Sequence, residues 1–221
     1  MIEIISIILQ IFYFIFLSLF PINVFNNNQQ YLQKNKFSFI DKFSSNTIIH
    51  LNILLFLSLI RIDFNLIFIF QILIGILFLF FFLKNNINFD ISNIYIISFI
   101  FIINLVLSIV IASNLTLGWD ADFRWIMKAL NFVQDNNVDN LQTFTDNEYP
   151  FLGSLVWGYF WKNSLLGYEY FGRLYYLYIF IISIYTLSDV LKTSLNYKIS
   201  IALIVIFLVF KYSHFNGYQD V

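Results

Sequence analysis

Six apolar stretches constrain what this chain can fold into more than any other feature. They cover residues 4–20, 47–60, 64–83, 91–112, 174–191 and 199–215. A helix needs about 20 mostly apolar residues to cross the hydrocarbon core of a bilayer, which is about 30 Å thick. The six stretches reach or approach this length, and their charged residues stand mainly at the ends. The pattern predicts an all-α membrane protein with about six transmembrane helices.

The composition excludes several other classes of protein. Of the 221 residues, 60% are hydrophobic and only 11% are charged, and the mean hydropathy is +0.78. Soluble domains are about 45–50% apolar and about 25% charged, and disordered chains are less hydrophobic still. Without Cys, the chain has neither disulfides nor thiolate metal ligands. A net charge of −1 without a basic patch gives no indication of nucleic-acid binding.

The basic residues predict which side of the membrane each loop faces, because cytoplasmic loops carry an excess of Lys and Arg. We place the loop after the first stretch inside. The lysines that then face the cytoplasm are Lys34, Lys36, Lys42, Lys84, Lys192 and Lys198. The N-terminus and the long polar segment 113–172 lie outside in this orientation, in a periplasm-like space.

The segment 113–172 concentrates acidic and aromatic residues. Six of the thirteen acidic residues lie between positions 120 and 148, and all four Trp lie between positions 119 and 161. Trp at the polar edge of a membrane protein usually marks the headgroup interface. We therefore expect an external loop that carries two interfacial helices, at 119–133 and 151–161. Pro150 favours a helix start after it, and Asp146 and Glu148 suit the N-terminal end of that helix.

The first of these helices has two predicted faces. Its apolar residues recur at spacings of three and four, at Trp119, Phe123, Ile126, Leu130 and Val133. Asp120, Arg124 and Lys128 follow one another at a spacing of four and form a polar face that points away from lipid. Two interpretations stay open. Asp120 and Arg124 stabilise a solvated helix, or the carboxylate is a base beside two cations that bind phosphate.

Three short elements of this polar part form an ordered set. Residues 118–122 read Gly-Trp-Asp-Ala-Asp, with Trp125 and Lys128-Ala129 after them. Residues 147–152 read Asn-Glu-Tyr-Pro-Phe-Leu, and residues 217–220 read Gly-Tyr-Gln-Asp. In sequence and order, these elements resemble the external loops of the GT-C superfamily of integral-membrane glycosyltransferases. The resemblance covers about residues 118–220, and all three elements fall on the predicted outer side.

The resemblance implies an enzyme that moves a sugar from a polyprenyl-phosphate donor to a glycan or lipid acceptor. Such enzymes modify cell-envelope glycans or lipids on the outer face of the membrane, here a bacterial inner (plasma) membrane. Asp120 is implied as the catalytic base for the acceptor hydroxyl. Cations would stabilise the charge that grows on the departing lipid phosphate. The implied substrate-binding residues are Asp122, Arg124, Lys128, Glu148, Tyr149, Arg173 and Asp220.

No cofactor or metal site is predicted. Asp122, Glu148 and Asp220 can orient sugar hydroxyls, and a divalent cation is chemically possible because hard cations prefer carboxylate oxygens. We divide the chain into a three-span region at 1–90 and the start of a GT-C-like core at 91–221. This core comprises a span, the external catalytic loop 113–172, two spans and the start of a second external loop. Family members usually have eight or more spans, so we expect the N-terminal part of a longer enzyme, inactive alone, or a reduced relative.

Two other classes of function stay open. A polysaccharide transporter or polymerase also has many spans, but a transporter places ionisable or helix-breaking residues near the midplane. The predicted spans are nearly free of charge, and Gly75 is the only helix-weakening residue deep in one. A non-catalytic membrane protein whose acidic loop binds a partner is the other class. It would tolerate single replacements of Asp120, Asp122 or Glu148.

Overall fold

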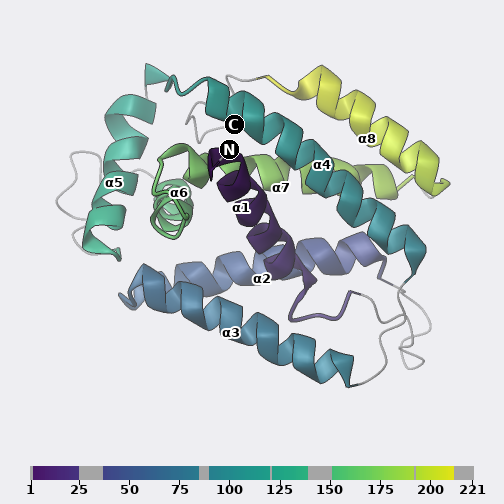
Figure 1. Ribbon diagram of the computed structural model, residues 1–221, viewed down its shortest axis with the longest axis horizontal. Coiled ribbons are helices and arrows are strands. Elements are labelled where there is room, and N and C mark those ends of the chain that lie inside the picture. Colours follow the sequence, from purple (N-terminus) through teal and green to yellow (C-terminus); the bar gives the residue numbers. More distant parts are fainter. Residues whose placement is uncertain are drawn as a thin grey trace.

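The computed structural model describes residues 2–24, 37–84, 90–119, 121–138, 151–191 and 193–211, and this part of the chain contains helices and no strands (Figure 1). The elements are α1 (Ile2–Leu19), α2 (Phe39–Leu59), α3 (Phe64–Leu83), α4 (Ile91–Ser113), a π-helix (Ala121–Trp125), α5 (Ile126–Asp135), α6 (Leu152–Lys162), α7 (Tyr170–Asp189) and α8 (Leu195–Val209). The all-α prediction is confirmed for these residues.

Four of the helices, α1, α3, α4 and α7, are long and apolar enough to cross a membrane. They correspond to four of the six predicted spans and support a membrane protein. The two other predicted spans fall in α2 and α8. Helix α2 has 21 residues but is more polar, and α8 is apolar but has only 15 residues. Six spans and the external position of residues 113–172 therefore stay predictions.

Helix α7 occupies the centre of the bundle and packs against α1, α2, α4, α6 and α8. Its core contacts are largely aromatic. The Phe160 ring of α6 stacks on Tyr175 of α7 with ring centroids 4.0 Å apart, and Phe14 of α1 meets both rings edge-on, at 5.1 and 5.0 Å. Aromatic pairs in these geometries contribute energy beyond the area they bury, so this cluster joins α1, α6 and α7 firmly.

Buried polar side chains also link the helices. The Tyr159 hydroxyl donates to Gln71 Oε1 at 2.8 Å, and the Tyr13 hydroxyl donates to the same oxygen at 3.0 Å. The Ser18 hydroxyl lies 2.6 Å from the Tyr178 hydroxyl. In apolar surroundings such hydrogen bonds hold helices together, because an unpaired polar group would be costly.

The helix ends gather at two ends of the bundle. At one, which we call the α6 end, Tyr170 at the start of α7 donates to Glu3 Oε1 of α1 at 2.8 Å. The Phe64 amide at the start of α3 donates to the Asn136 carbonyl after α5 at 2.7 Å. Helices α5 and α6 lie here (Figure 1, left). We call the other end of the bundle the α2 end. Here Lys198 Nζ at the start of α8 lies 2.6 Å from Asp189 Oδ1 at the end of α7, and the two side chains form an ion pair.

Candidate functional site

Helix α6 is enclosed between α5 and α7 at the α6 end (Figure 1). All its residues from 154 to 160 are buried. The Ser154 hydroxyl donates to the Trp125 carbonyl at 3.1 Å, and the Tyr176 hydroxyl of α7 donates to the Gly153 carbonyl. The prediction of an interfacial helix at 151–161 implied one face outside the protein. The structure instead buries residues 154–160 of α6 within the protein and leaves Leu152 at its start exposed.

Two glycines explain how α6 reaches this position. A Cβ atom at Gly158 would lie 2.9 Å from the Ala129 carbonyl oxygen of α5. A Cβ atom at Gly172 of α7 would lie 2.3 Å from the Trp157 carbonyl oxygen of α6. Both distances are shorter than a side-chain atom tolerates, so the backbones of α5, α6 and α7 approach closely because these residues have no side chain.

The prediction that Lys128 lies on a solvated polar face is wrong, because Lys128 is buried at 2% exposure. Its Nζ lies 5.5 Å from the centre of the Trp125 ring, within the range of a cation–π interaction. The buried face of this segment consists of Trp125, Lys128, Ala129 and Phe132, which follow the spacing of one helical face. Apolar periodicity alone does not reveal this face, because it contains a lysine.

The neighbouring predicted residues do not share one face with Lys128. Asp122 is exposed and Arg124 is half-buried, whereas Trp119, predicted on the apolar face, is 66% exposed. A π-helix at Ala121–Trp125 precedes α5. The buried residues Ala121, Trp125 and Ala129 still follow one another at a spacing of four, so the buried face is simply a different face from the predicted apolar one.

Arg173 of α7, a predicted substrate-binding residue, is completely buried. Its guanidinium group pairs with Glu169 one turn earlier. Arg173 Nε lies 3.0 Å from Glu169 Oε1, and Arg173 Nη2 donates to Glu169 Oε2 at 3.0 Å. The charge-assisted hydrogen bond from Nη2 and the second close contact at Nε hold the guanidinium beside the carboxyl group. Sequence reasoning did not select Glu169, although an acid four residues before an Arg at a helix start is a recognised signal.

Glu169 lies just before α7, outside the candidate membrane span. Burial raises the pKa of its carboxyl, and the Arg173 charge and hydrogen bond oppose this effect without cancelling it. The Glu169 backbone carbonyl also accepts a hydrogen bond from Trp157 Nε1, at 3.3 Å. The carboxyl is therefore held in an enclosed place where its charge is costly unless a cation stays beside it.

Trp157 of α6 joins the two sides of the site. On one side it belongs to a buried cluster with Ala121, Trp125 and Ala129, next to Lys128. On the other side it contacts the backbone that carries the Glu169 and Arg173 pair. The structure thus places the two buried cations of the prediction, Lys128 and Arg173, on the two helices that flank α6.

The remaining predicted site residues lie outside the described part of the chain. They are Asp120, Glu148, Tyr149 and Asp220. Among the residues that the structure describes, no three His, Asp or Glu side chains come together as a group that could hold a metal ion. The described site therefore supplies two enclosed cations, aromatic walls and the Glu169 carboxyl.

Comparisons with known proteins give no match: no protein-family model, curated protein or solved structure is similar to this chain.

Proposed function

We propose that the protein is an integral-membrane glycosyltransferase that transfers a sugar from a polyprenyl-phosphate donor to a glycan or lipid acceptor. One observation carries the proposal. The segments that resemble GT-C enzymes, around 118–129 and 147–152, directly flank α5 and α6, and the buried cations Lys128 and Arg173 lie on the helices that enclose α6. Along the sequence, the acidic residues of this segment thus stand next to helices that bury positive charge.

The proposed reaction needs one base and stabilised positive charge. Asp120 accepts the proton of the acceptor hydroxyl, whose oxygen attacks the anomeric carbon of the donor sugar. The bond from this carbon to the phosphate oxygen breaks, and the polyprenyl phosphate leaves with the electron pair. Lys128 and Arg173 stabilise the negative charge that develops on this phosphate, which is worth more in an enclosed site than in water.

Other residues complete the proposed site. Asp122, Glu148 and Asp220 orient sugar hydroxyls, and Arg124 and Tyr149 contact the donor. The protein lies in a bacterial inner membrane with residues 113–172 on the outer side. In support, the candidate membrane spans would hold the protein in the bilayer, which is where a donor with a long apolar tail resides.

The test is sugar transfer by the full natural protein in detergent micelles, from a radiolabelled polyprenyl-phosphate sugar to a lipid or glycan acceptor. Asp120→Asn should lower the transfer rate by about a hundredfold or more, because it removes the general base. Asp135→Asn is the matched control. Asp135 is an exposed acid at the end of α5 that has no role in the proposed site, so its replacement should leave the rate unchanged.

Two results would count against the proposal. Full activity of the Asp120→Asn protein removes Asp120 from the role of base. No transfer by the wild-type protein favours the non-catalytic protein that binds a partner.

A further inference from the structure

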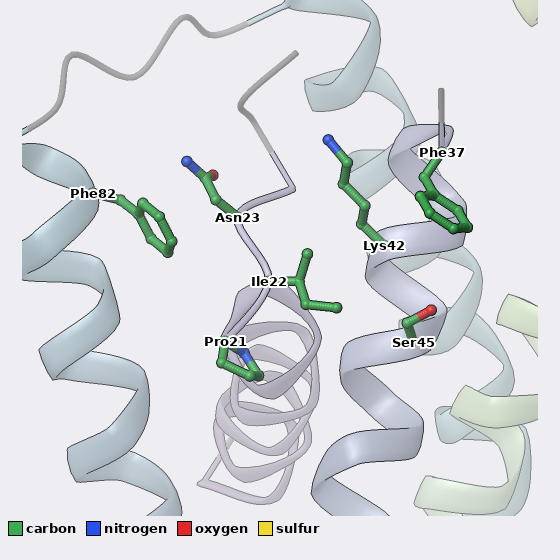
Figure 2. Close-up of a pocket in the computed structure, with 7 residues that line it drawn as sticks. All are labelled: Pro21, Ile22, Asn23, Phe37, Lys42, Ser45 and Phe82. Carbon is green, nitrogen blue, oxygen red and sulfur yellow. The ribbon is translucent and has the colours of Figure 1, made fainter. Parts of the chain in front are cut away.

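A cavity of about 390 Å³ lies at the α2 end of the bundle, away from α5 and α6 (Figure 2). Three segments line it: the residues after α1, the first turns of α2 and the last turn of α3. Pro21, Ile22 and Phe82 contribute apolar surface, and Asn23 and Lys42 contribute polar groups. Figure 2 shows the Asn23 and Lys42 side chains extending toward the same end of the cavity. The cavity is thus amphipathic, with the Asn23 amide and the Lys42 ammonium group at one end and the Ser45 hydroxyl further along α2.

The wall formed by residues 20–22 is fixed in place by α2. Asn46 Nδ2 donates to the Ser18 carbonyl at 3.0 Å and to the Ile22 carbonyl at 2.9 Å, and Asn46 Oδ1 accepts from the Ile22 amide at 2.8 Å. His50 Nε2 lies 2.9 Å from the Phe20 carbonyl oxygen. Because these bonds already hold the wall, a ligand would not have to order it on binding.

The depth of the cavity matches the headgroup region of a bilayer. Helices α1 and α3 have 18 and 20 residues. At 1.5 Å per residue they are about 27 and 30 Å long, close to the thickness of the hydrocarbon core. The cavity lies at the C-terminal ends of both candidate spans. Its polar groups therefore fall at the level where lipid phosphates lie.

The charge of the lining favours an anion. Lys42 is the only charged residue in the described lining, and it is half-buried. Burial lowers the pKa of its ammonium group, which a phosphate beside it would counteract. The adjacent carboxylate of Asp41 is turned to the helix start, where it accepts from the Ser38 amide at 2.9 Å. Asp41 is not part of the lining.

We propose that this cavity binds the headgroup of an anionic phospholipid, with the phosphate at Lys42 and Asn23 and the glycerol end against Ile22 and Phe82. The lysine distribution predicts that this end faces the cytoplasm, where anionic lipids attract basic groups at the membrane surface. The proposal is independent of the glycosyltransferase activity, since the cavity is at the opposite end from α6.

The experiment is native mass spectrometry of the full, delipidated protein titrated with phosphatidylglycerol and, separately, with phosphatidylcholine. Lys42→Gln should weaken the first binding event of phosphatidylglycerol by about fivefold, the contribution expected of one lysine at an anionic surface. Lys84→Gln is the matched control. Lys84 is exposed at the end of α3, at the same end of the bundle, but does not line the cavity.

Two further variants keep the test decisive if Lys42→Gln destabilises the protein. Lys42→Arg retains the charge and should retain binding. Ser45→Phe leaves Lys42 unchanged but puts a ring into the lining, and it should weaken binding as well. Circular dichroism and thermal unfolding in the same detergent establish that each variant is folded.

Either of two results would overturn the proposal. The first is equal affinity of Lys42→Gln and Lys84→Gln for phosphatidylglycerol. The second is that Lys42→Gln weakens the binding of inorganic phosphate but leaves the binding of phosphatidylglycerol unchanged. The cavity would then be a site for free anions. Stronger binding of phosphatidylglycerol than of phosphatidylcholine, lost only in the cavity variants, supports it.

Discussion

Helices α3 and α7 have the same length but opposite relations to the rest of the protein. Each has 20 residues and is apolar enough to cross a membrane. Their most apolar 18-residue windows have mean hydropathies of 3.0 in α3 and 1.3 in α7. The buried shares of these windows are 17% and 61%. The more hydrophobic helix is thus the less buried one, the reverse of the usual order in soluble proteins.

The difference follows from what surrounds a membrane protein. Lipid is as apolar as a protein core, so hydrophobicity alone does not select which face of a helix turns inward. In α3 the buried positions are Phe64, Ile67, Gln71 and Gly75, which include its interior polar residue and its glycine. In α7 the buried face carries Arg173 and several tyrosines. Polar and small residues therefore mark the inner faces of both helices.

The largest expected effect concerns the ion pair at the start of α7. Glu169→Ala should lower the free energy of unfolding by about 3 kcal/mol, because it leaves the buried Arg173 guanidinium without the carboxyl group that accepts its hydrogen bond. We choose the lower end of the usual range because the Glu169 side chain is 19% exposed. Urea or SDS unfolding in mixed micelles measures it.

Two comparisons sharpen this prediction. The double variant Glu169→Gln with Arg173→Met should be less destabilised than Glu169→Ala, because no buried charge is left without a counter-ion. Lys198→Gln breaks the Asp189 pair, in which neither side chain is fully buried, and should cost about 1 kcal/mol or less. Equal losses of stability on breaking the two ion pairs would show that the burial of Arg173 does not determine how much its pair contributes.

The next effect compares one glycine in each helix. Gly172→Ala in α7 places a methyl group against the Trp157 carbonyl and should destabilise by about 1–3 kcal/mol. Gly75→Ala in α3 meets only the Phe16 ring, a half-buried side chain that can move. Since Ala favours a helix over Gly by about 0.5–1 kcal/mol, Gly75→Ala should be neutral or slightly stabilising. Thermal unfolding of both variants in one detergent shows whether each substitution raises or lowers stability. An equal loss of stability in both variants would show that the two glycines are equally constrained.

A smaller effect is expected at the inward polar residue of α3. Gln71→Leu removes hydrogen bonds to Tyr13 and Tyr159 and from Gln71 Nε2 to the His50 carbonyl. Hydrogen bonds between helices in membranes contribute about 0.6 kcal/mol on average and up to about 1.7. We expect a loss in this range. Phe80→Ala, on the exposed face of the same helix, is the control and should change stability little, whereas a larger loss there would contradict the assigned faces.

The sequence allowed the positions of the apolar helices to be predicted because length and hydropathy are local properties. The predicted stretches at 64–83 and 91–112 agree with α3 and α4 nearly residue for residue. The bundle interior was not predictable in this way. Which residues of α3 and α7 turn inward depends on polar and small side chains that meet only in the folded protein.

The candidate site shows the same limit. The basic residues Lys128 and Arg173 could be selected from the sequence, but not their burial. The face of α5 was assigned wrongly because a lysine interrupts the apolar pattern of the face that is buried. The spacing of four between Glu169 and Arg173 could have indicated their ion pair, but the enclosure of Glu169 beside Trp157 could not be read from the sequence.

The smallest effect expected is a pH dependence that Glu169 gives to the α7 region. Burial raises the pKa of its carboxyl in the folded protein above the unfolded value. The stabilising contribution of the protonated group is therefore complete at low pH and is lost as the pH rises through the folded pKa. Relative to Glu169→Gln, which cannot titrate, the wild type should lose stability as the pH rises from about 4 toward neutrality. Melting temperatures of both proteins across this range test the sign, and parallel curves would show that Arg173 cancels the effect of burial.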